Sequence, residues 1–149
     1  MEKDPAVGFL YFSFDNGGMV KNFEPAWNDY DLLFTQYTTL LYTDIGEAYP
    51  YLVTGVLLNR FHVAAAVDTV HDFASISFET AQGMTYANAL DVIGYDWKRY
   101  DFENNVYTMR PWISYLIRDP QGYYFKLRFV GFYNSDGLKG YPTIEFQRL

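Results

Sequence analysis

The sequence predicts an all-β protein, a single antiparallel β-sandwich or barrel-like domain. Aromatic residues make up 21% of the 149-residue chain, and Phe, Tyr and Trp favour strands and half-buried surfaces over helix interiors. Short runs of alternating apolar residues are separated by Gly- and Asp-rich turns along the chain, a pattern typical of sandwiches and barrels. The length suits one domain, and we expect residues 1–149 to form it.

The N-terminal part is expected to contain a hairpin and three further strands. Residues 7–20 predict a strand followed by a turn of Asp, Asn and Gly, which tolerate positive φ and suit a hairpin. A second strand is predicted to begin near Trp27, and further strands over 51–59 and 60–69. Gly55 indicates a bulge or the close approach of another backbone segment.

The middle of the chain, residues 70–91, gives a weaker signal. Residues 72–78 alternate as a strand does, whereas residues 84–94 predict at most a short helix that Gly94 ends. A helical turn or a long loop is therefore expected in this region.

The C-terminal third gives the clearest pattern. Alternating strands are predicted at 112–118 and 123–129. The residues between them, Asp119-Pro120-Gln121-Gly122, follow the preferred pattern of a type I turn. In the last strand, Ile144 and Phe146 are expected to face inward.

The composition excludes several classes of function. The formal net charge of −7 opposes binding to phosphate backbones and to anionic lipid, so we expect no nucleic-acid partner. The chain has no cysteine, which excludes disulfides, thiolate catalysis and cysteine-based zinc sites. No apolar run approaches the roughly 20 residues of a membrane-spanning helix, and no signal peptide is expected in the chain as written.

Four segments resemble those of a known family: DYDLLFTQYTTLLYTD, YPYLVTGVLLN, VIGYDWKRY and YLIRDPQGYYFKLRFVGFYNSDGLKGYPTIEFQ. The sequence is similar to the HmuY-like family of exported bacterial haem-binding lipoproteins from about Val7 onward. The resemblance implies an all-β, non-enzymatic protein on the extracellular or outer-membrane surface, held by a lipid anchor upstream of this chain. It also implies capture of haem between two axial side chains, for delivery to an outer-membrane receptor in iron acquisition.

The resemblance implies that Met84 and Met109 are the axial ligands of the haem iron. The family's second ligand shortly precedes a Pro and a strand, as Met109 does in YTMRPW, and the first lies in an irregular segment, which fits Met84 in TAQGMTY. Thioether sulfur is a soft ligand suited to haem iron. From the residues alone, filling a gap in the core is the commoner role of a methionine, and we expect that role for Met19.

Two histidines and one tyrosine are alternative ligands. His62 and His71 form the rival pair, since neutral imidazole is a common haem ligand. Both lie upstream of the regions in which the family carries its ligands. Tyr95 is a possible single oxygen ligand, although Tyr is so abundant here that a packing role is the simpler interpretation.

Further residues are candidates to contact the propionates and the porphyrin of the haem. Its propionates favour Arg or Lys at the rim of the pocket, and the basic residues near the proposed ligands are Arg110, Lys98 and Arg99. An apolar cleft is needed for the porphyrin, and its candidate lining residues are Trp112, Tyr107 and Tyr86. Solvated charges and core packing are the alternative explanations.

A carbohydrate-binding or cell-surface interaction domain that binds no haem is the second hypothesis. Sugars stack on Trp or Tyr and bond to Asp, so Trp27 with Asp29 and Asp31 would be candidates. An enzyme is the third hypothesis, because the two aspartates would share one face of a strand as a carboxylate pair. An adhesin or structural role remains a fourth.

Overall fold

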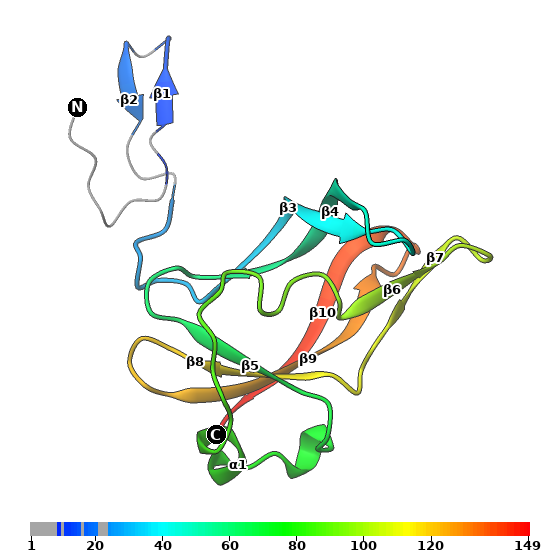
Figure 1. Cartoon of the computed structure of the whole chain (residues 1–149). Helices are drawn as coiled ribbons and strands as arrows, with labels where there is room; N and C mark the ends of the chain where they lie inside the picture. The colour runs from blue at the N-terminus through cyan, green and yellow to red at the C-terminus, as the bar shows by residue number, and fades with distance from the viewer. Residues whose placement is uncertain (1–8, 10, 16, 21–23) are drawn as a thin grey trace.

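The structure is a computed structural model, and it describes residue 9 and residues 11–15, 17–20 and 24–149. It confirms the all-β prediction (Figure 1). The strands are β1 (Tyr11–Ser13), β2 (Gly18–Val20), β3 (Leu32–Tyr42), β4 (Ala48–Leu58), β5 (Ala64–Asp68), β6 (Lys98–Asp101), β7 (Val106–Met109), β8 (Ser114–Arg118), β9 (Tyr124–Tyr133) and β10 (Lys139–Arg148). A 3-10 turn, η1 (Phe73–Ser75), and one short helix, α1 (Phe78–Gln82), lie between β5 and β6.

The largest sheet has four antiparallel strands in the order β10-β9-β8-β5. The predicted turn between β8 and β9 is present, and the Gly122 N–H donates to the Asp119 carbonyl at 3.1 Å. The other strands pair as β1–β2, β3–β4 and β6–β7. The first of these pairs confirms the predicted N-terminal hairpin, although residues 7, 8, 10 and 16 of that prediction lie outside the described part of the chain.

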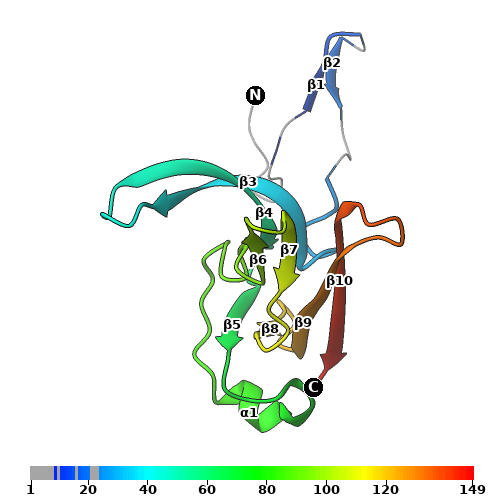
Figure 2. The ribbon, with the colours of Figure 1, turned by 90° about the vertical axis from the view of Figure 1, so that its right-hand side faces the viewer.

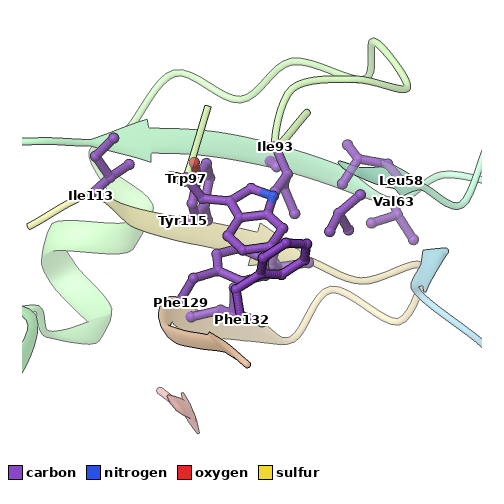
Figure 3. Packing of buried hydrophobic residues seen from close by; sticks show 12 residues of the cluster. Leu58, Val63, Ile93, Trp97, Ile113, Tyr115, Phe129 and Phe132 are labelled. Carbon is purple, nitrogen blue, oxygen red and sulfur yellow. The ribbon is translucent and has the colours of Figure 1, made fainter. Parts of the chain in front are cut away.

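One face of the four-stranded sheet carries the main core (Figure 3). Because side chains alternate along a strand, Ala65, Tyr115 and Phe129 share this face with their neighbours. Trp97 stacks on Phe129 with ring centroids 4.2 Å apart. Val56 from β4 is fully buried in the same cluster. The β3–β4 ribbon therefore closes the main core from one side.

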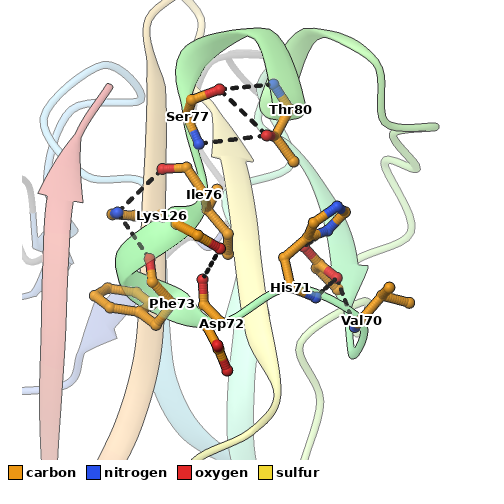
Figure 4. A network of polar contacts seen from close by, with 10 residues as sticks. Val70, His71, Asp72, Phe73, Ile76, Ser77, Thr80 and Lys126 are labelled. Carbon is orange, nitrogen blue, oxygen red and sulfur yellow. Dashed lines mark hydrogen bonds and ion pairs between the residues drawn. The ribbon is translucent and has the colours of Figure 1, made fainter.

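The opposite face of the sheet is covered by η1 and α1 (Figure 4). Ala66 and Leu116 on this face pack with Ile76 and Ala81 in a second cluster. Lys126 also lies on this face and is only 3% exposed. Its alternation with core residues was predicted, but its burial was not.

Among the described residues, β3 and β4 form the longest pairing, which runs in register from Leu32 opposite Leu58 to Tyr42 opposite Ala48. Figure 2 shows it curving away from the four-stranded sheet. The close backbone approach predicted at Gly55 is confirmed, since a Cβ there would lie 2.5 Å from the Gly94 carbonyl oxygen.

The helical turn expected in the middle of the chain is present, but it lies earlier than residues 84–94. Residues 72–78 were expected to alternate as a strand, but they form η1 and the start of α1. The helix begins after Ser77, whose hydroxyl accepts the Thr80 N–H at 3.2 Å, and it ends at Gly83. Residues 84–94, where a helix was expected, contain turns and isolated bridges instead.

Three strand predictions also need correction. β3 begins at Leu32 rather than near Trp27, because the Asn59 side chain donates to the carbonyls of Trp27 and Tyr30, both at 2.6 Å, and holds this segment as a turn. β5 begins only at Ala64, after a turn. Ile144 packs against the main core as expected, whereas Phe146 lies opposite the core residue Leu127 but is 64% exposed, because β10 is an edge strand.

Within the part of the chain that the structure describes, no helix is both long and apolar enough to cross a membrane.

Candidate functional site

The two methionines proposed as ligands occupy different environments. Met109 is the last residue of β7, is half-buried, and packs against the main core. Met84 lies two residues after the end of α1, is half-buried, and packs against the second cluster. Its N–H donates to the Ala81 carbonyl at 3.3 Å. Both sulfurs therefore lie at the margin of an apolar cluster.

The two clusters lie on opposite faces of the four-stranded sheet. Ala65 belongs to the main core and Ala66 to the second cluster, and adjacent residues of a strand point to opposite faces. The structure thus places Met84 on one side of the sheet and Met109 on the other. For both sulfurs to reach one iron, at least one methionine must leave the cluster in which it packs.

The histidines lie at opposite ends of β5. His62 is exposed and has a positive φ of 68° in the turn before the strand. His71 follows the strand, and its Nδ1 lies 2.9 Å from a carboxylate oxygen of Asp68. Since β5 itself spans roughly 13 Å, the structure does not bring the two imidazoles together.

Asp68 holds the loop that carries His71. Burial alone would raise the pKa of the Asp68 carboxyl. Hydrogen bonds from the N–H groups of Val70 and His71, together with the His71 ring, lower that pKa overall. The buried Asp68 carboxylate therefore orients the His71 ring. Such a contact occurs both in histidine ligands and in ordinary surface histidines.

Lys98 is buried rather than at an exposed rim. It is 7% exposed, and its Nζ donates to the Thr54 carbonyl at 2.5 Å. The ammonium lies 4.0 Å from the centroid of the Trp97 ring and 5.1 Å from that of Phe132. Burial lowers the pKa of Lys98 to about 8, against an opposing effect of Asp96. Its charge is engaged inside the protein, whereas Arg99 is exposed.

Arg110 lines a pocket of about 340 Å³ beside the main core. The polar residues of its wall come from four segments of the chain and are Tyr37, Asp91, Tyr95, Asp96, Arg110 and Tyr115. The apolar part of the wall comes from β5, from residues 92–93 and from Ile113. The Arg110 N–H donates to the Trp97 carbonyl at 3.0 Å, which fixes the position of this residue.

The three aromatic residues proposed to line a porphyrin cleft are separated. Tyr107 is half-buried against the main core, and its N–H donates to the Tyr133 hydroxyl at 2.6 Å. Trp112 is 62% exposed. Tyr86 packs with the second cluster and donates to the Ala81 carbonyl at 3.0 Å; burial raises its pKa to about 12. Tyr107 thus packs against the same cluster as Met109, and Tyr86 against the same cluster as Met84.

The residues considered for sugar binding near the N-terminus precede β3. The ring centroids of Trp27 and Phe61 are 6.0 Å apart, and Trp27 is partly exposed. Asp29 and Asp31 lie in a turn and a bend rather than on one strand face, so the expected carboxylate pair of a strand is not formed. Burial, with a contribution from Asp119, raises the pKa of Asp31.

Sequence reasoning missed most of the pocket wall. Tyr37, Asp91, Asp96 and Tyr115 were not singled out, because each is an ordinary residue of a strand or turn when taken alone. The sequence signal nearest to this region is Gly55, whose predicted close backbone approach is made to Gly94 of the pocket wall.

Comparison with known proteins identifies the family. The sequence model described as HmuY protein matches residues 7–146, nearly the whole chain. This chain belongs to the HmuY family. Its identification thus agrees with the resemblance carried by the strand and turn motifs.

Two solved HmuY-like structures are similar to this member. One is the apo HmuY analog of Tannerella forsythia, with 9% identity, a TM-score of 0.43, and coverage of 80% of this chain and 97% of that one. The other is a putative HmuY-like haem-binding protein of Bacteroides vulgatus, with 15% identity, a TM-score of 0.39, and coverage of 92% and 82%. A search of curated proteins gives no match.

Proposed function

We propose that this protein binds haem and acts by capture and release, without catalysis. The observation that supports the proposal is membership of the HmuY family over residues 7–146. The family resemblance implies two axial side chains, and the methionines in the corresponding segments supply a donor set that suits haem iron. When bound, haem would contribute its iron as the centre that the two axial groups hold.

Met109 fits the role of an axial ligand by its surroundings. It ends a β-strand at the margin of an apolar cluster, and Tyr107 lies on the same face of that strand. A half-buried thioether beside an aromatic ring offers both a ligand and an apolar wall. Met109 would therefore hold one side of the iron.

Met84 would supply the second ligand after leaving the second cluster. Its segment is held by the N–H bond to the Ala81 carbonyl, the Tyr86 hydroxyl bond to the same carbonyl, and the paired hydrogen bonds between Ala65 and Ala87. The Tyr86 ring also contacts Tyr124 and Arg118. Met84 itself follows the two bonds at Ala81, so a rearrangement of the residues just after α1 could carry it to the edge of the sheet. The rival pair, His62 and His71, would need the whole of β5 to be rearranged.

The propionates would pair with cations near Met109. Arg110 is half-buried directly after Met109, and Arg99 is exposed on the neighbouring strand β6. Lys98 is a weaker candidate for a direct pair, because its ammonium already donates to the Thr54 carbonyl. Arg110 is our first choice, since guanidinium binds carboxylates with two parallel hydrogen bonds.

The proposal extends to the biological setting by family resemblance. We propose that the protein works on the extracellular or outer-membrane surface, attached by a lipid anchor upstream of this chain. The haem would be passed to an outer-membrane receptor for iron acquisition.

A haemin titration followed by absorbance tests the function. Wild type, Met84→Ala and Met109→Ala are compared under oxidising and reducing conditions, with Met19→Ala as the matched control. We expect a saturable Soret shift in wild type and in the control, stronger after reduction because soft sulfur prefers ferrous iron. The shift should be lost or altered in both ligand variants.

Each other outcome has a defined meaning. If both methionine variants keep the wild-type spectrum, the ligands lie elsewhere, and the same titration with His62→Ala and His71→Ala follows. If wild type gives no saturable shift in either redox state, haem binding by this chain is rejected.

A further inference from the structure

The pocket beside the main core is more polar than a haem cleft would require. Three tyrosines, two aspartates and Arg110 share a wall around a space of about 340 Å³. This volume is at the lower end of the roughly 300–1,000 Å³ of small-molecule sites. The space therefore suits one small ring rather than a macrocycle.

The polar groups of this wall are not engaged with each other. In the part of the chain that the structure describes, the side chains of Asp91, Asp96 and Arg110 form no hydrogen bond and no ion pair. Arg110 is nonetheless close enough to Tyr115 to lower the pKa of the Tyr115 hydroxyl, which Asp96 raises. A set of donors and acceptors with no internal partners can all be directed at a ligand.

The buried Tyr115 also contributes a polar group to this pocket. Its side chain is 2% exposed and packs with its ring centroid 5.8 Å from that of Phe129 (Figure 3). No hydrogen bond to its hydroxyl is present among the described residues, yet no fully buried polar side-chain atom there lacks a partner. The hydroxyl must therefore reach solvent, and the pocket that Tyr115 lines is where it does so.

The protonation states of the wall favour a neutral ligand. Burial raises the pKa of Tyr37 to about 12, with further contributions from Asp91 and Asp96. Burial also raises the pKa of Tyr115. These phenols are therefore hydrogen-bond donors near neutral pH. Two carboxylates and one guanidinium place acceptors and donors side by side in the wall, which a neutral ligand carrying both kinds of group can satisfy.

We propose that the pocket formed by Tyr37, Asp91, Asp96, Arg110 and Tyr115 binds a single sugar ring. A sugar presents adjacent hydroxyls that both donate and accept, so it can satisfy carboxylates, a guanidinium and phenols together. Its C–H face would lie against the apolar wall that includes Ile113. This inference goes beyond the proposed haem function and does not rest on it, and Arg110 is the one residue that both proposals use.

Ligand-observed NMR and calorimetry with defined sugars test the inference. The probes are glucose, galactose, mannose and N-acetylglucosamine, each as free sugar and as methyl glycoside. The two forms distinguish a free monosaccharide from the end of a glycan. We expect saturable binding of at least one probe to wild type. Asp96→Asn and Tyr115→Phe should each weaken it by about tenfold or more, since the first replaces a charged acceptor with a neutral amide and the second removes a hydroxyl donor.

The controls separate a lost site from a lost fold. Asp136→Asn removes the same charge from an exposed turn and should bind as wild type does. Tyr115→Phe keeps the buried ring, and its unfolding transition is compared with that of wild type. Binding of no sugar, equal binding by the pocket variants, or binding of amino acids such as arginine and glutamate in place of sugars would each overturn the inference.

A parallel haemin titration keeps the two proposals distinguishable. Asp96→Asn should give the wild-type Soret shift, because Asp96 has no proposed contact with haem. If wild type binds haem but no sugar, only the proposal for the pocket is rejected. If wild type binds a sugar but no haem, only the proposed haem function is rejected.

Discussion

Lys126 is the residue whose replacement tests the account of the fold most directly. Its Nζ donates to the carbonyls of Phe73 at 2.8 Å and Ile76 at 3.1 Å, and lies 3.5 Å from that of Ala74 (Figure 4). The ammonium also lies 4.9 Å from the centroid of the Phe73 ring. One cation on β9 thus fastens the 3-10 turn and the start of the helix to the sheet. Lys126→Met keeps most of the apolar stem and removes only the donors.

The magnitude follows from the groups left behind. Two buried carbonyls would lose their partner, at a cost of about 1–3 kcal/mol each. Removal of a buried ammonium offsets part of that cost, because its desolvation no longer opposes folding. We expect a net loss of about 2–3 kcal/mol in the free energy of unfolding.

Urea unfolding followed by circular dichroism measures this loss. Lys139→Met is the matched control, since Lys139 is exposed on β10 and a surface change should stay within about 0.5 kcal/mol. Hydrogen exchange of residues 73–84 should increase selectively in Lys126→Met. A variant as stable as the control, with wild-type exchange in that segment, would refute the reasoning.

Two further predictions concern the β3–β4 side of the molecule. Gly55→Ala should lower the free energy of unfolding by about 1–3 kcal/mol, because its Cβ would lie 2.5 Å from the Gly94 carbonyl oxygen. Gly83→Ala is the control in the same urea assay. It should be close to neutral, because the nearest atom to its Cβ would be 3.5 Å away. Wild type should gain stability relative to Lys98→Met as pH rises from about 8 to about 10, because folded Lys98 loses its proton there while unfolded Lys98 keeps it. A flat or falling difference between the two stability curves would contradict the second prediction.

The strand content and the tight turns could be predicted because they are local properties. The type I turn at 119–122 is encoded in four consecutive residues, and the approach at Gly55 is indicated by an isolated glycine in a strand. The helix could not be placed, because five residues are too few to establish a helical period. Its Thr80 also stands where a capping box usually has Glu or Gln.

The burial of Lys126 depends on residues far away in the chain. Alternation assigns this lysine to the face opposite the main core, but its carbonyl partners lie 50 and 53 residues earlier. The same limit applies to the proposed sugar pocket, whose wall combines residues of β3, residues 91–96, Arg110 and β8. No local pattern relates such segments to each other.

The positions of the two methionines set a quantitative condition on haem binding. Moving Met84 out of the second cluster would cost at most the roughly 1.5–3 kcal/mol of a fully buried methionine. Loss of the two hydrogen bonds at Ala81 adds about 1 kcal/mol each. A micromolar complex releases about 8 kcal/mol, so ligation by both methionines is energetically accessible. The rearrangement would nevertheless weaken the affinity by about a hundredfold or more relative to a preformed site. A methionine pair that already faced one cleft would avoid this loss, so the measured affinity itself reports whether Met84 moves.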